Sequence, residues 1–215
     1  SETAAAPAEA AAEPSVADVL GSVHTSNFPD LLRELHSTLI VSTYQAGKLV
    51  LLRPDGAVIN THFRPFRRPM GLHADRNRLV LGAHMEIIEF RNVPDVAARL
   101  QQPPRHDGVF CARDLHVTGA IDIHELALDG DGEVWFINTL FSCLCTLDAV
   151  SRFAPAWRPR FVSHYAPEDR CHLNGLAVRD GFPRYVTALG ETNTPQGWRA
   201  NKRDGGILID LDSDE

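Results

Sequence analysis

The stretch Ile-His-Glu-Leu-Ala-Leu-Asp-Gly-Asp-Gly-Glu-Val-Trp-Phe at residues 123–136 decides the fold. It predicts a strand, a tight turn and a second strand, because apolar residues flank the polar Asp-Gly-Asp-Gly sequence. Glycine supplies the positive φ angles that tight hairpin turns need. Related stretches occur at residues 69–81 and 173–186, and the three align on Leu72, Leu126 and Leu176.

The shared leucines are 54 and 50 residues apart. Each copy continues into a third short β-rich run, at residues 86–90, 142–147 and 206–210. An internal period of this size predicts repeated sheets, as in the four-stranded blades of a β-propeller. Short β-rich runs also occur from residue 37 onward, so the predicted class is all-β.

The blade count leaves the ring open. Three blades and part of a fourth are predicted, whereas propellers typically have four to eight. We therefore expect an incomplete propeller, the N-terminal part of a six- to seven-bladed ring. Residues 1–17 are alanine-rich and acidic and are expected to form a disordered tail, with the blades at 18–215.

The composition excludes several classes of protein. The net charge of −7, from 21 Lys and Arg against 28 Asp and Glu, argues against a nucleic-acid partner. No apolar run reaches the roughly 18 residues of a membrane helix, so no membrane partner is expected. The four cysteines do not form a zinc-type spacing and predict free thiols in a reducing cytoplasm. Cys143 and Cys145 are expected on one strand face as small buried residues.

The candidate site follows from the repeat. In a propeller the first strand of each blade lines the central channel. His124 and Asn174 lie two residues before the shared leucine, and Asp122 and His172 lie four before it. Strand periodicity places these four side chains on one face. Because the leucines have the same parity, they must lie deeper in the channel, or the strands must bulge at Glu125 and Gly175.

Two imidazoles, an amide and a carboxylate at one point are typical ligands of a divalent transition metal, here copper, iron or zinc. On this hypothesis the metal ligands are His124, His172, Asn174 and Asp122, and the two imidazoles lie within about 5 Å of each other. The alternative is that these side chains only cap strand ends or bond the backbone.

Two further residues are candidates for substrate binding. Arg170 has the fork of donors that suits a substrate carboxylate or phosphate, although a structural ion pair is an equal alternative. His116 lies on the long segment 93–119 and is expected either to cover the channel mouth or to be solvated. Cys171 should point to the opposite face from His172 and serve in packing.

Four segments carry a resemblance to a known family: Ser-Thr-Tyr-Gln-Ala-Gly-Lys-Leu (42–49), Arg-Pro-Met-Gly-Leu (68–72), the stretch from Asp122 to Leu144, and Pro-Glu-Asp-Arg-Cys-His-Leu-Asn-Gly-Leu-Ala (167–177). The chain resembles, over roughly residues 24–212, a bacterial family of conserved hypothetical proteins of unknown function. The resemblance implies a longer protein with further blades and another histidine motif, present as a further segment or as a second chain. A weaker similarity at the level of fold, through Asn174-Gly175, is to the six-bladed lactonase and gluconolactonase-like propellers.

Two functional hypotheses come from these residues. The first is a metal-dependent enzyme, an oxygenase or a hydrolase, that acts on a small-molecule or peptide substrate at the propeller axis. The second is a non-catalytic propeller that binds a ligand or a protein through its loops. Metal content separates them.

Overall fold

The computed structural model describes residues 23–100 and 106–213. The predicted tail at 1–17 lies outside the described residues. Within them the protein is all-β, and the strands form four antiparallel sheets. No helix in the described part is long and apolar enough to cross a membrane. The chain divides into two compact units, and each is described by itself.

The smaller unit contains the described residues up to Ile40 together with Leu51–His62. Its helix α2 (Phe28–Glu34) begins with a proline in the first turn, where the missing N–H costs nothing. Arg33 at the end of α2 pairs with Asp30 at 2.5 Å. The strands β1 (Leu39–Thr43), β2 (Lys48–Asp55) and β3 (Val58–Pro65) form a three-stranded sheet in chain order.

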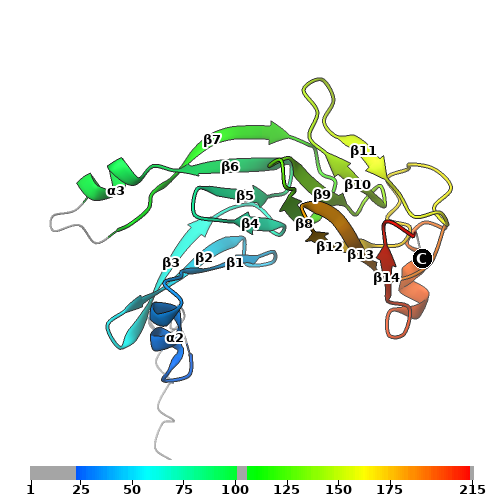
Figure 1. The fold of residues 1–215 in the computed structure, drawn as a ribbon. Helices are drawn as coiled ribbons and strands as arrows, with labels where there is room; N and C mark the ends of the chain where they lie inside the picture. Colours follow the sequence, from blue (N-terminus) through cyan, green and yellow to red (C-terminus); the bar gives the residue numbers. More distant parts are fainter. Residues whose placement is uncertain (1–22, 101–105, 214–215) are drawn as a thin grey trace, which may run out of the picture. The chain divides into compact units, whose positions relative to one another are not determined.

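The larger unit, Val41–Val50 with the chain from Phe63, includes the remaining residues of β1, β2 and β3 and holds three more sheets (Figure 1). The first comprises β4 (Leu72–Ala74), β5 (Arg78–Gly82), β6 (Glu86–Asn92) and β7 (Phe110–Val117), with α3 (Pro94–Leu100) between its last two strands. The second comprises β8 (Ile123–Leu128), β9 (Val134–Asn138), β10 (Cys143–Thr146) and β11 (Ala154–Trp157). The third comprises β12 (Leu173–Arg179), β13 (Phe182–Ala188) and β14 (Ile207–Asp210), with the 3₁₀ helix η1 (Gly197–Asn201) before β14.

The sheets repeat one another in detail, as the sequence period predicts. The first strands β4, β8 and β12 begin at or within two residues of the predicted positions 70, 123 and 173. The shared leucines Leu72, Leu126 and Leu176 pair with Leu81, Phe136 and Val186 at matching places in the second strands. The three repeats therefore have one local architecture.

The entry into each first strand is also repeated. Arg68, Asp122 and His172, each four residues before the shared leucine, have φ angles of 48°, 53° and 51°. Non-glycine residues seldom adopt this left-handed conformation. The register of β8 shifts between Ile123 and Leu126, and that of β12 between Leu173 and Leu176. Of the two alternatives for the shared leucines, a deeper position or a bulge at Glu125 and Gly175, the structure shows the bulge in both strands. A bulge of this kind re-aims the side chains beside it.

Neighbouring sheets meet through their first strands. β8 lies beside both β4 and β12, as Figure 1 also shows. Gly71, just before β4, is so near the β8 backbone that a Cβ atom there would lie 2.9 Å from the carbonyl carbon of Glu125. Only glycine permits this approach, so Gly71 allows the backbone before β4 to lie in close contact with β8.

Buried apolar clusters join the sheets. One cluster connects β5, β6 and the second sheet through residues such as Val80, Phe136, Cys143 and Cys145. Cys143 and Cys145 are fully buried with their Sγ atoms 3.4 Å apart, so the prediction of one shared face is confirmed. A second cluster joins β9, β10 and the third sheet and includes Cys171, which confirms its packing role.

The fourth strands, β7 and β11, were not predicted. β7 falls within the segment 93–119, which the sequence analysis treats as one long excursion. Most of its side chains are exposed, including Leu115 and Val117. A strand that is exposed on both faces carries no alternation of apolar and polar residues, and so periodicity does not detect it.

Candidate functional site

His124 and His172 form a pair at the start of the second and third sheets. His124 is the second residue of β8, and His172 immediately precedes β12. Their ring centroids are 4.7 Å apart, and the ring planes meet at 86°. The predicted convergence of the two imidazoles within about 5 Å is confirmed.

The loop before β12 is fixed to the second sheet. The Asp169 amide donates to the Leu140 carbonyl at 2.8 Å, and the Arg170 amide donates to the Ser142 hydroxyl at 3.0 Å. The Thr139 hydroxyl donates to the Leu173 carbonyl at 2.7 Å. Hydrogen bonds to the second sheet therefore fix the backbone on both sides of His172.

His172 is oriented by a carboxylate. Its Nδ1 lies 3.0 Å from both oxygens of Asp169, and Trp198 Nε1 donates to Asp169 Oδ2 at 3.1 Å. The Trp198 ring also contacts the imidazole, with centroids 4.3 Å apart. A carboxylate at Nδ1 holds the proton there, and Nε2 then carries the lone pair of the neutral ring. Carboxylates orient metal-bound and catalytic histidines in this way.

His124 is held by an amide. The Nδ2 of Asn174 lies 3.2 Å from His124 Nδ1, so the amide donates and the ring nitrogen accepts. Burial, and after it repulsion from the His172 ring when that ring is protonated, lower the pKa of His124 to about 4, against the opposing effects of Asp122 and Asp169. His124 is therefore neutral at pH 7, as metal ligation requires.

Two of the four predicted ligands, His124 and Asn174, lie inside a first strand, and the other two, Asp122 and His172, lie just before one. Asp122 precedes β8 in the left-handed conformation and its carbonyl accepts from the Thr139 amide at 3.2 Å. Neither Asp122 nor His172 lies inside its strand, so strand alternation alone does not put their side chains on the face of His124. In residues 23–100 and 106–213, no group of three or more His, Cys, Asp or Glu side chains is placed to hold a metal.

Arg170, two residues before His172 along the chain, lies in a buried polar network. Its guanidinium donates to Glu168 at 2.7 Å, to Ser163 at 3.0 Å and to Asn193 at 2.8 Å. A further guanidinium nitrogen lies 2.9 Å from Nε2 of His164. Only 7% of the side chain is exposed. These contacts are those of the structural ion pair that the sequence analysis gives as the alternative to substrate binding.

His116 has a different partner. It lies on β7, and its Nε2 is 2.9 Å from the carbonyl oxygen of Arg152. Among the described residues it is therefore joined to the β10–β11 hairpin and not to the histidine pair.

Sequence reasoning did not select Asp169 or Trp198 as site residues. The spacing Asp-x-x-His at 169–172 was a signal for the first, because a left-handed Asp169 turns its carboxylate back toward His172. No local signal points to Trp198, which comes from η1, 26 residues after His172 along the chain.

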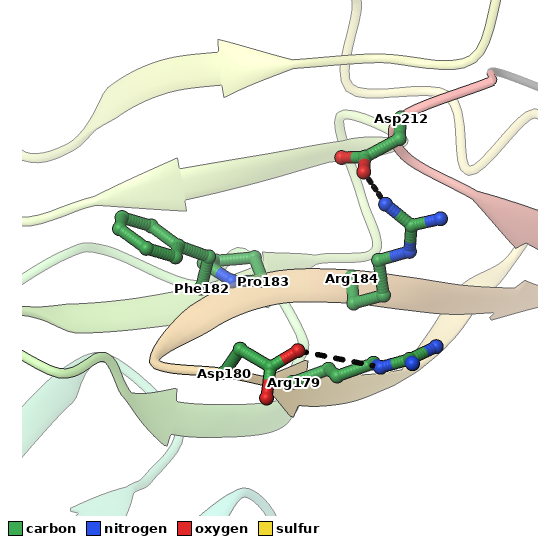
Figure 2. A pocket seen from close by; sticks show the side chains of 6 residues that line it. All are labelled: Arg179, Asp180, Phe182, Pro183, Arg184 and Asp212. Carbon is green, nitrogen blue, oxygen red and sulfur yellow. Dashed lines mark ion pairs between the residues drawn. The ribbon is translucent and has the colours of Figure 1, made fainter.

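A surface cavity of about 380 Å³ lies at the other end of β12. Its lining is Arg179, Asp180, Phe182, Pro183, Arg184 and Asp212 (Figure 2). Figure 2 shows Asp180 facing Arg179 and Asp212 facing Arg184, and both are ion pairs. Seven residues of strand separate this cavity from His172, roughly 20 Å, and its arginines are paired, so the histidine pair is the better candidate site.

The lowered pKa of His124 predicts a pH effect on stability. The folded state resists protonation of His124 down to about pH 4, whereas the unfolded chain takes up that proton near pH 6.5. The free energy of unfolding should therefore fall as the pH drops from 6.5 toward 4, by about 1–3 kcal/mol from this group. Urea unfolding of wild type and of His124→Gln at pH 7.5 and 4.5 measures the effect. The variant should lose less stability than wild type, and equal losses would contradict the assignment.

The comparisons with known proteins give a family without a function. No curated protein matches the chain. The model of a domain of unknown function, DUF4915, matches residues 26–215, which include all three aligned repeats and the histidine pair. The chain therefore belongs to the DUF4915 family.

Proposed function

We propose that this protein is a metal-dependent enzyme in which the Nε2 atoms of His124 and His172 bind one divalent transition ion, copper, iron or zinc. The observation that carries the proposal is the ring pair at 4.7 Å. Two nitrogens bonded to one ion at about 2.0–2.1 Å are at most about 4.2 Å apart, which rings at this separation can reach by small rotations.

The partners of the two Nδ1 atoms support the proposal. Asp169 engages Nδ1 of His172, and Asn174 engages Nδ1 of His124. The contact with Asp169 leaves Nε2 of His172 with a lone pair for the ion. Binding through Nε2 of His124 requires the ring proton on Nδ1, and the Asn174 side chain would then turn so that its amide oxygen accepts from Nδ1, because metal-binding histidines commonly donate their other ring N–H to an oxygen.

The remaining positions around the ion suit oxygen ligands. The carboxylate of Asp122 acts electrostatically on His124, and the Asn174 amide lies 3.2 Å from His124 Nδ1, so these two side chains are the candidates. Water would fill the rest, and an open position is what catalysis requires. The ion would supply Lewis-acid activation of water or of an oxidant toward a small-molecule or peptide substrate. Whether the reaction is hydrolytic or oxidative depends on which ion is bound.

We also propose that the sheets are blades of a β-propeller. The support is the repeated entry at Arg68, Asp122 and His172, the repeated bulge, and the contact of β8 with both β4 and β12. In a propeller these first strands line the axis, so ligands from successive blades converge there. With no membrane-spanning helix in the described part and four free cysteines, a reducing cytoplasm is the proposed location.

Metal content tests the proposed function. The purified chain is loaded separately with Cu(II), Fe(II) and Zn(II), loosely bound ions are removed with a weak chelator, and the metal is measured by elemental analysis. About one ion per chain is expected for at least one metal, together with a higher unfolding temperature, because an ion that binds only the folded state stabilises it. A chain that stays metal-free at unchanged stability would favour the non-catalytic binding propeller.

A further inference from the structure

A cluster of cations, Arg199, Lys202 and Arg203, lies on and after η1. All three side chains are exposed. Within the described part of the chain none of them has an ion-pair partner, whereas Arg78, Arg170 and Arg184 are each paired with a carboxylate. Three exposed cations thus lie within five residues of a protein whose net charge is −7.

The cluster lies against the histidine site through one indole ring. The Cζ atom of Arg199 is 4.4 Å from the Trp198 ring centroid, and Nζ of Lys202 is 5.4 Å from it. The same indole lies 4.3 Å from the His172 ring. Because these distances share the indole centroid, both charges lie within about 10 Å of His172, close to the Debye length at physiological salt.

The position of the cluster is fixed by the fold. Trp198 is only 6% exposed, and its Nε1 is bound to Asp169. The backbone N–H of Gln196, at the start of η1, donates to the Glu168 carbonyl at 3.0 Å. The side-chain oxygen of Gln196 accepts from Arg199 Nε at 2.7 Å. The segment that carries the cations is thus attached to the loop that carries Asp169 and His172.

We propose that Arg199, Lys202 and Arg203 bind an anionic group of the substrate, a carboxylate or a phosphate, while the reacting part of the substrate lies at His124 and His172. This inference rests on the proposed function, since it names the substrate class of the same site. Cations near a site attract anionic ligands and raise their rate of association. An anionic group several bonds from the reacting atom would span the distance between the cluster and the imidazoles.

Anion binding by the metal-free protein tests the inference. Inorganic phosphate and succinate are titrated separately at pH 8 and constant ionic strength, and Trp fluorescence and heat are recorded. Wild type should bind one of the two anions saturably. The variant Arg199→Gln/Lys202→Gln/Arg203→Gln should bind it at least tenfold more weakly. The matched control Arg64→Gln/Arg67→Gln/Arg113→Gln removes the same charge from exposed positions elsewhere and should bind as wild type does.

The outcomes are separable from those of the metal experiment. Absence of saturable binding to wild type, or equal affinity in both triple variants, overturns the inference. A wild-type chain that binds the anion but takes up no metal leaves the anion site standing and rejects the proposed function. The preferred anion distinguishes a carboxylate from a phosphate substrate.

Discussion

The double variant His124→Ala/His172→Ala is expected to bind the ion at least about a hundredfold more weakly than wild type, because altering even the residues that orient metal ligands costs 10–100-fold. This change removes both proposed nitrogen ligands, the two imidazoles whose ring centroids are 4.7 Å apart. The measurement is competition against a chromophoric chelator, with circular dichroism to confirm that the variant is folded.

Two other variants test whether the loss of metal affinity is specific to the histidine pair and to the orientation of His172. His36→Ala/His116→Ala removes two histidines outside the pair and should leave the affinity unchanged. Asp169→Asn keeps both ligands but weakens the contact that orients His172, and it should reduce affinity by 10–100-fold. If the double variant still takes up one ion per chain, the metal lies elsewhere and the histidines serve only the sheet.

Arg170→Met is expected to lower the free energy of unfolding by about 2–4 kcal/mol. Breaking a buried ion pair by removing one partner costs about 3–5 kcal/mol. The lower range applies because the Glu168 side chain is 35% exposed and water can partly replace the lost contact. Ser163 and Asn193 also lose their bonds to the guanidinium. Urea unfolding followed by circular dichroism measures the loss.

The control for Arg170 is an ion pair on the surface. Arg33→Met removes the partner of Asp30, whose side chain is 74% exposed, and should change stability by less than about 0.5 kcal/mol. An Arg170→Met protein that unfolds like wild type but no longer binds phosphate or succinate would reverse the assignment and make Arg170 a substrate residue.

Individual residues show which features of the fold could be predicted from the sequence and which could not. The aligned leucines Leu72, Leu126 and Leu176 located the first strand of each repeat. Their shared parity with His124 required either a deeper position in the channel or a bulge near residue 125, and the bulge is what the structure shows. Both predictions depend on local rules, the repeat period and strand alternation, and both are confirmed. β7 and β11 were missed because exposed strands lack the alternation on which the prediction relies.

The sequence by itself predicted the all-β class, the position of each first strand and the convergence of His124 with His172. The class and the strands follow from local patterns, and the histidine pair follows from the repeat, because each copy carries the same turn and strand pattern and so puts a histidine near the start of a first strand in both the second and the third sheet. Only the tertiary structure decided the surroundings of the pair. Trp198 reaches Asp169 across 29 residues of chain, and Arg170 meets Asn193 across 23. Contacts of this kind follow from how sheets and loops pack in space, and no spacing within one repeat encodes them.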